Sequence, residues 1–422
     1  MPATGKETPE DARDGFSSES TTESRSRYHL PLLDVYRGVA ILFVFAHHVV
    51  YWSHGFAKIP WNDRGFRSLD VAWENWAILP LTLGHGGVAA FFVISGFCIH
   101  LSHVRATERA FASRKQLTLA ANWGLFSWRR FWRIYPPYII AGCLFLVTDV
   151  LAGQLRDAAS IVKQGSTHAF LIHNFFESTM YGINPSLWSI AVEVQLYAVF
   201  PVLWWLLRGV GMLSTMAIVA FIELTIRSLI AVDAFPAQGW WRLVSQGPFA
   251  YWFSWSLGAW LCHNWLVGHR GILNRAPIVV GISLVAMTWF FQVADAFFFT
   301  AVAILTSQLL SRQLPAFGTA PVIETHMITR ILSLMGIISY SLYLFHQPFI
   351  SAAHACLIRL VPDASQAFTL FALLATLVPI GMLSLASYYA IEKRSVVFGN
   401  WLALWLSSSS VKAGRNCDAN PA

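Results

Sequence analysis

Charged side chains are scarce in this 422-residue sequence. Asp, Glu, Lys and Arg together make up 12% of the residues, whereas 56% of the residues are hydrophobic. Soluble domains carry about twice that share of charge. The mean hydropathy of +0.52 is typical of a polytopic membrane protein, and a large water-soluble core is therefore excluded.

Cysteine is also sparse, with five residues and no pair at CxxC spacing. Small buried hydrophobic positions explain them, so the sequence predicts no disulfide framework. The 14 histidines include no HExxH motif and no Cys/His cluster, so no metal site and no bound cofactor are expected. A Gly-x-Ser-x-Gly nucleophile elbow is missing as well, which disfavours a covalent route through serine.

Long apolar runs, in contrast, are abundant. Ten of them could cross about 30 Å of hydrocarbon, which predicts an all-α polytopic integral membrane protein with about ten transmembrane helices. The even number places both chain ends on one side of the membrane. The runs lie near residues 32–52, 79–101, 134–151, 186–207, 210–232, 249–267, 276–292, 294–312, 333–357 and 367–391.

Basic residues in the loops indicate which side is cytoplasmic. One set of loops carries more of them, and we expect that side, with both termini, to face the cytoplasm of a bacterial inner membrane. The net charge of +7 then reflects topology and contact with membrane lipid, and nucleic-acid binding is not predicted. Residues 1–30 and 396–422 are expected to be cytoplasmic tails around a membrane domain at 31–395. The basic loop residues are Arg105, Arg109, Arg114, Lys115, Arg129, Arg130, Arg133, Arg208, Arg270, Arg275, Arg312 and Arg330.

Two ionisable residues share a face of the first predicted span. Arg37 and His48 are eleven positions apart, so they return to nearly the same azimuth of a helix, separated by roughly 16 Å along its axis. Ionisable groups in an apolar span are costly and commonly functional, so we expect both to face one cavity. Pairing of Arg37 with Asp34, three positions earlier, is the structural alternative.

An arginine pair marks the start of the third span. Arg130 and Arg133, at i and i+3 among aromatic residues, would project together and could bind the phosphates of a nucleotide or of coenzyme A. A simple positive-inside anchor explains them equally well, but the aromatic neighbours suit a stacked ring system.

Polar stripes follow the fourth and ninth spans at spacings of three and four. Glu193 is expensive to bury near the middle of a span and is expected to meet a cation or a polar substrate. By contrast, Glu223 and Arg227 at i and i+4 can neutralise each other, so a structural role is favoured. The stripes contain Ser186, Ser189, Glu193 and Tyr197, and Ser339, Tyr343, His346 and Gln347.

Six short motifs, in this order, resemble the membrane-bound acyltransferase 3 family of polytopic O-acyltransferases. They span about residues 30–395. The motifs are LDxxRGxAxxxVxxxH at Leu33 to His48, FFVISGF at Phe91 to Phe97, RRFWRIYP at Arg129 to Pro136, SLWSIAVEVQLY at Ser186 to Tyr197, ISYSLYLFHQP at Ile338 to Pro348, and YAIEK at Tyr389 to Lys393.

The resemblance implies ten helices, an acyl-CoA donor, of which acetyl-CoA is the expected one, and an acceptor hydroxyl presented in or across the membrane. The family's arginine and histidine map onto Arg37 and His48, and its arginine pair maps onto Arg130 and Arg133. We expect His48 to act as a general base, Arg37 to bind the acceptor or the oxyanion, and Glu193 to orient His48 or the acceptor. Asp34, Ser189, Tyr197, Tyr343 and His346 are expected to line the substrate cavity.

The acceptor is expected to be a sugar hydroxyl of a surface or secreted polysaccharide or glycoside. A transporter or flippase for a polar substrate is the alternative, because buried ionisable residues are common to both classes. An internal repeat would favour the transporter, and we see none.

Overall fold

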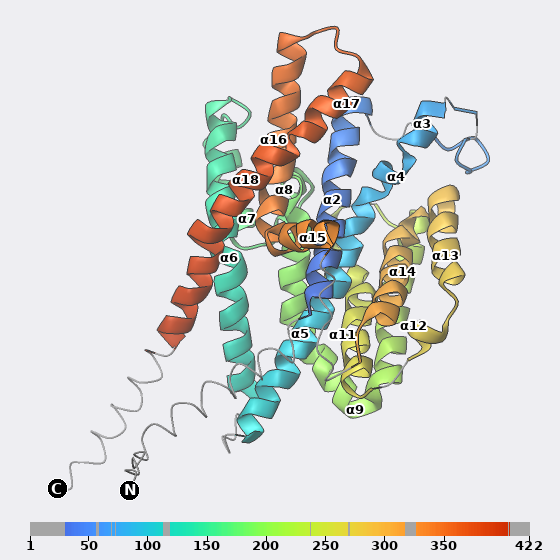
Figure 1. The fold of residues 1–422 in the computed structure, drawn as a ribbon, viewed down its shortest axis with the longest axis vertical. Helices are drawn as coiled ribbons and strands as arrows, with labels where there is room; N and C mark the ends of the chain where they lie inside the picture. The colour runs from blue at the N-terminus through green and yellow to red at the C-terminus, as the bar shows by residue number, and fades with distance from the viewer. Residues whose placement is uncertain are drawn as a thin grey trace, which may run out of the picture.

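The computed structural model describes residues 30–403 and 405, except 56–58, 69, 72, 113–118, 237, 269–270 and 317–325. Helices dominate this part of the chain (Figure 1). Of two isolated β-bridges, Trp61 with Arg67 lies within the loop after α2, and Phe66 with Phe291 connects this loop to the end of α13. The first half contains α2 (Pro31–His54), α3 (Trp73–Ala77), α4 (Leu79–Thr82), η1 (Leu83–His85), α5 (Gly86–Ala112), α6 (Leu119–Leu151), α7 (Ala158–Ala169), η2 (His173–Phe175), α8 (Glu177–Met180) and α9 (Leu187–Ala231).

The second half is built from shorter helices. A bend of 78° separates α15 from α16. The elements are α10 (Gly239–Ser245), η3 (Pro248–Tyr251), α11 (Trp252–Leu266), α12 (Ile272–Arg275), α13 (Ile278–Phe290), η4 (Gln292–Phe297), α14 (Phe298–Gln313), α15 (Met327–Ile337), α16 (Ser339–Leu360), α17 (Gln366–Ala375), α18 (Leu377–Ser387) and the π-helical turn η5 (Tyr388–Glu392).

The chain is a multi-pass membrane protein, but fewer spans are long enough than the sequence suggests. Among the described residues, six helices are long and apolar enough to cross a membrane, or seven if α15 and α16 count as one bent span. The expected ten all correspond to helical segments. However, α11 and α13 have only 15 and 13 residues. The runs at 186–207 and 210–232 are counted once, because they follow each other without a loop in α9 and are separated only by a break at Gly211.

Helix α9 reverses direction at a single residue. Gly211 has φ of 80° and ψ of 171°, a backbone conformation open to glycine and strained for other residues. The 45 residues of α9 would span about 68 Å if straight, more than twice the hydrocarbon thickness. The break divides it into two antiparallel segments, which Figure 1 shows meeting at the lower edge of the molecule.

The described ends of the chain bear on the domain boundaries. Most of the expected tails 1–30 and 396–422 lies outside the described part, which leaves out residues 1–29, 404 and 406–422. After η5 the helix continues to Ala403, so helical structure extends past the boundary expected at residue 395. We call the side on which α2 begins the inner side, which the loop charges predict to be cytoplasmic, and the side on which α2 ends the outer side.

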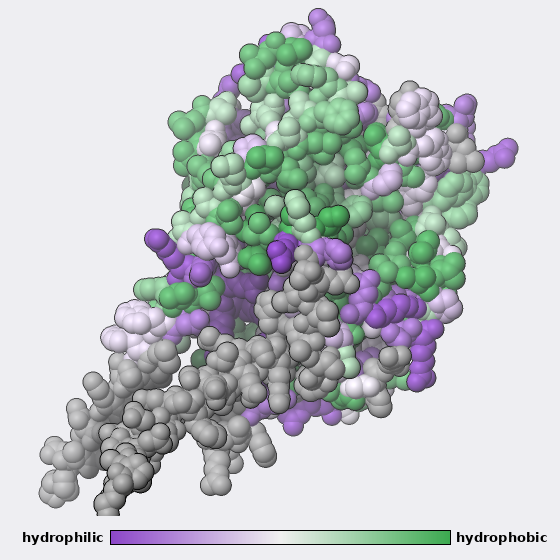
Figure 2. Space-filling view, in the orientation of Figure 1, coloured by the Kyte–Doolittle hydropathy of each residue, from purple (hydrophilic) through white to green (hydrophobic). Residues whose placement is uncertain are grey.

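Buried apolar residues of α2, α5, α9, α11 and α16 form one continuous core. The surface over α16 and α17 is largely apolar, whereas polar residues gather toward the inner side (Figure 2). Local signals set the ends of several helices. Pro31 occupies the first turn of α2, where its missing N–H costs nothing, and Asp157 caps α7 by accepting from the Ser160 N–H at 2.7 Å.

Candidate functional site

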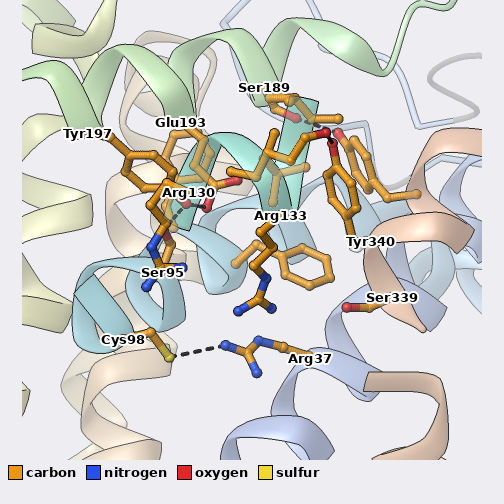
Figure 3. A pocket seen from close by; sticks show the side chains of 16 residues that line it. Arg37, Ser95, Cys98, Arg130, Arg133, Ser189, Glu193, Tyr197, Ser339 and Tyr340 are labelled. Carbon is orange, nitrogen blue, oxygen red and sulfur yellow. Dashed lines mark hydrogen bonds between the residues drawn. The ribbon is translucent and has the colours of Figure 1, made fainter. Parts of the chain in front are cut away.

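A cavity lies between α2, α5, α6, α9 and α16. Figure 3 shows side chains from all five helices converging on it. Eight of the residues singled out from the sequence line it: Arg37, Arg130, Arg133, Ser189, Glu193, Tyr197, Ser339 and Tyr343. The membrane core therefore contains a polar chamber built from segments far apart in the sequence.

A second cavity lies toward the inner side. Asp34, Arg105 and Glu392 are among the residues that line it. Both cavities are lined by Arg37, Cys98, Arg130 and Arg133, and we call these four residues the neck. A ligand that enters from the inner side meets three guanidinium groups before it reaches the first cavity.

Each of two neck arginines is held by specific bonds. Arg37 donates to Asp34 Oδ1 at 2.8 Å and to Cys98 Sγ at 3.1 Å, so it pairs with Asp34 and still faces both cavities. Arg130 donates to Ser102 Oγ at 3.1 Å, and its guanidinium carbon lies 5.8 Å from the centre of the Tyr197 ring. The contact with Tyr197 is a favourable cation–π geometry.

Glu193 ends a chain of hydrogen bonds inside the first cavity. Trp255 Nε1 donates to Ser95 Oγ at 3.3 Å, and Ser95 Oγ lies 3.2 Å from Tyr197 Oη. Tyr197 donates its single proton to the Glu193 carboxylate, so Ser95 must be the donor to Tyr197. The three hydrogen bonds all run in the direction of Glu193, so the Glu193 carboxylate is the acceptor at the end of the chain.

The fourth and ninth segments meet through their polar stripes, as expected. Ser189 Oγ lies 2.6 Å from Tyr343 Oη, and Ser186 Oγ lies 3.4 Å from His346 Nε2. His346 is completely buried and does not line either cavity. Its ring is 5.3 Å from the ring of Tyr343, so it lies directly behind the cavity wall.

His48 lies behind the same wall, and this differs from the expectation that Arg37 and His48 face one cavity. Only Arg37 lines the cavities, because eleven residues of helix place the two side chains at different depths of the membrane. The His48 ring lies 4.9 Å from the His346 ring. Its Nδ1 lies 2.9 Å from the Val44 carbonyl, which can only accept, so Nδ1 carries the proton and Nε2 is the basic atom.

Sequence reasoning missed several residues of the site. Ser95, Cys98 and Ser102 follow one another at spacings of three and four on α5, which is a usable signal that we did not follow. Tyr340 lines the first cavity and donates to the Ile134 carbonyl at 2.8 Å. Glu392 lies inside a quoted motif, and its carboxylate accepts from Ser341 at 3.1 Å.

Glu223 and Arg227 interact electrostatically, as expected, but the hydrogen bonds of the Glu223 carboxylate are made with other residues. The Glu223 carboxylate is completely buried and accepts from Ser254 N at 2.9 Å, Ser254 Oγ at 2.6 Å and Thr300 Oγ1 at 2.6 Å. The carboxylate thus accepts a hydrogen bond from a backbone N–H in the first turn of α11, where a negative charge is favourable. The Arg227 guanidinium lies 4.6 Å from the Tyr251 ring centre. Among the described residues, no group of three His, Cys, Asp or Glu side chains could hold a metal ion.

Comparisons with known proteins find several relatives that are similar to this chain in sequence. The chain is similar to the O-acetyltransferase OatA of Staphylococcus aureus (25% identical over 357 residues, 76% of this chain and 51% of that protein). It is also similar to the peptidoglycan O-acetyltransferase OatA of Listeria monocytogenes (25% over 189 residues, 43% of this chain and 25% of that protein). A regulator of hypoxia-inducible factor 1 from Caenorhabditis elegans is 27% identical over 195 residues, 44% of this chain and 35% of that protein.

The chain thus spans about half or less of the length of these relatives. No solved structure is significantly similar to it. The profile of an acyltransferase domain family matches residues 30–386, which include every helix that lines the first cavity. This protein belongs to the acyltransferase 3 family.

Proposed function

We propose that this protein is a membrane O-acyltransferase that moves an acetyl group from acetyl-CoA, bound from the cytoplasmic side, to a sugar hydroxyl of a surface or secreted polysaccharide or glycoside. The observation that carries the proposal is the neck, where three arginines separate an inner cavity from a polar chamber. The names of the OatA relatives support an acetyl group and a sugar acceptor.

In the proposed reaction, Arg130 and Arg133 bind the phosphates of the donor, because guanidinium groups form paired hydrogen bonds with phosphate oxygens. The thioester then reaches the first cavity beside Arg37. This arginine stabilises the oxyanion that develops on the thioester oxygen, and Glu193 accepts a hydrogen bond from the sugar.

His48 acts as the base from behind the cavity wall. Its Nε2 removes the proton of the acceptor hydroxyl, the new C–O bond forms, and the C–S bond breaks to release coenzyme A. Tyr343 belongs to the wall that separates His48 and His346 from the cavity. A change in its side-chain conformation would bring the acceptor oxygen to His48.

Radiolabelled acetyl-CoA tests the proposal. Membranes containing the wild type, His48→Ala or Arg130→Ala would be incubated with the label and with glycans from a cell lysate. We expect label in a glycan fraction with the wild type and a loss of about 100-fold or more with His48→Ala. His326→Ala and Arg359→Ala, both at exposed positions outside the site, serve as matched controls and retain activity.

Arg130→Ala is expected to raise the KM for acetyl-CoA more than it lowers kcat, because it removes a donor-binding group. If the wild type transfers no histidine-dependent label from any acyl-CoA, the transporter alternative replaces this proposal.

A further inference from the structure

Four histidine rings follow one another from the buried catalytic region to an exposed position in η1, near the start of the span that contains α5. The ring of His346 is 4.9 Å from that of His48, His48 is 5.3 Å from His47, and His47 is 5.3 Å from His85. His346 is completely buried, whereas His85 is exposed. We call His48, His47 and His85 the histidine chain, because they connect the proposed base to the surface.

Gly84 allows η1, which carries His85, to lie against α2, which carries His47 and His48. A Cβ atom on Gly84 would lie 1.8 Å from the Phe43 carbonyl oxygen and 2.7 Å from the His47 Cβ. Any larger residue would therefore push η1 away from α2 and separate His85 from His47. A glycine is required here for the contact, which gives the Gly84-His85 sequence a structural reason beyond ordinary helix packing.

The backbone fixes the tautomer of each ring. Nδ1 of His47 lies 2.8 Å from the Thr82 carbonyl, Nδ1 of His48 lies 2.9 Å from the Val44 carbonyl, and Nδ1 of His85 lies 3.4 Å from the Thr82 carbonyl. A carbonyl only accepts, so each Nδ1 holds a hydrogen and each Nε2 keeps its lone pair. Every member can take a proton on Nε2 and pass it on without breaking its backbone bond.

We propose that the histidine chain carries the proton of the acceptor hydroxyl from His48 through His47 and His85 to the outer side. The inference rests on the proposed function, in which His48 is the base. Rings about 5 Å apart can exchange a proton directly between Nε2 atoms or through one bridging water. The chain gives the protonated His48 an exit that does not cross the arginine neck.

The step balances as follows for one transfer. The hydroxyl oxygen bonds to the thioester carbon, the C–S bond breaks, and coenzyme A leaves as a thiolate that takes a proton from water on the inner side. The hydroxyl proton moves from His48 to His47, then to His85, and is released to water on the outer side. One proton therefore appears outside and one disappears inside for each ester formed.

Chemical rescue distinguishes a proton carrier from a structural residue. We expect His47→Ala and His85→Ala to lower the kcat of label transfer about tenfold while the KM for acetyl-CoA stays unchanged, and imidazole in the buffer to restore most of the rate. His54→Ala is the matched control, since His54 lies one to two turns further along α2 and its Nδ1 lies 2.7 Å from Ser53 Oγ. Its rate should be unchanged and insensitive to imidazole.

The outcomes separate the two proposals. If His48→Ala is inactive but His47→Ala and His85→Ala are as active as the wild type, or are slow without imidazole rescue, the histidine chain is wrong and the proposed function stands. If the wild type shows no transfer that depends on His48, both fail.

A measurement on the wild type avoids the question of whether a variant folds. The protein would be sealed into vesicles with a pH-sensitive dye in the compartment that faces its outer side and holds the glycan acceptor. We expect that compartment to acidify in step with label transfer. Label transfer without acidification would show that His48 returns the proton directly to coenzyme A, which would overturn the chain.

Discussion

The contact between α5 and α11 lets us predict how much a substitution there would change the free energy of unfolding. The two helices touch through facing glycines. A Cβ atom on Gly258 would lie 1.8 Å from the Val93 carbonyl oxygen, and one on Gly96 would lie 2.0 Å from the Trp255 carbonyl oxygen. Backbone atoms cannot rotate away as a side chain can, so either substitution to alanine must move the helices apart by about 1 Å or more.

We expect Gly258→Ala to lower the free energy of unfolding by about 3 kcal/mol, the upper end of the range for overpacked cores. A gap of this size also forfeits a quarter to a half of the dispersion energy of the contacts along the interface. Because Trp255 donates to Ser95 across it, the hydrogen-bond chain to Glu193 is disturbed and acyl transfer falls as well.

Unfolding of the purified protein in detergent measures the effect. Gly142→Ala in α6 is the control, because a Cβ atom there meets nothing within 4 Å and alanine is the better helix former by about 0.5–1 kcal/mol. The double variant Gly96→Ala with Gly258→Ala should lose clearly less free energy of unfolding than the sum of the losses of the two single variants, since the first substitution already separates the helices. Full additivity, or a Gly258→Ala protein as stable as Gly142→Ala, would refute this reasoning.

Three further predictions concern other parts of the fold. Glu223→Gln should destabilise the protein by about 1–3 kcal/mol, because the buried acceptor of three hydrogen bonds loses its charge. The control Ser228→Ala, at an exposed position, should leave thermal unfolding unchanged. Burial lowers the pKa of His173 to about 3, below its unfolded value of about 6.5, so its contribution to stability is complete above pH 6.5 and is lost as the pH falls toward 3. The unfolding temperature should then drop less steeply with acid in His173→Asn than in the wild type. Arg67→Ala removes a guanidinium 3.8 Å from the Trp61 ring and should speed proteolysis of the loop after α2, with unchanged cleavage as the contrary result.

Sequence reasoning located the residues of the chamber better than their depth in it. The i, i+3 and i, i+4 spacings placed Ser189, Glu193 and Tyr197 on one face of α9, and the structure confirms that this face lines the cavity. Periodicity gives the azimuth of a side chain but not what stands in front of it. The position of His48 behind the cavity wall depends on how α16 packs, which a single sequence does not encode locally.

The number of membrane-spanning helices could not be predicted from the apolar runs alone. Apolar runs show where hydrocarbon can be crossed, but they do not show whether a helix is complete within the run. The run at 276–292 contains the helix α13, which stops at Phe290 after 13 residues. The hydrogen-bond partners of Glu223 could not be predicted either, because Ser254 and Thr300 come from α11 and α14, far along the chain.

The reversal of α9 at Gly211 has a consequence for how the protein enters the membrane. Two antiparallel segments with no loop between them leave the ribosome as one apolar stretch of 45 residues. Arg208 is the basic residue at the turn, so the positive-inside rule assigns it the signal that keeps the turn on the side of synthesis. During biogenesis the two segments would therefore insert together as a helical hairpin, which delivers Glu193 and Glu223 to the membrane in a single step.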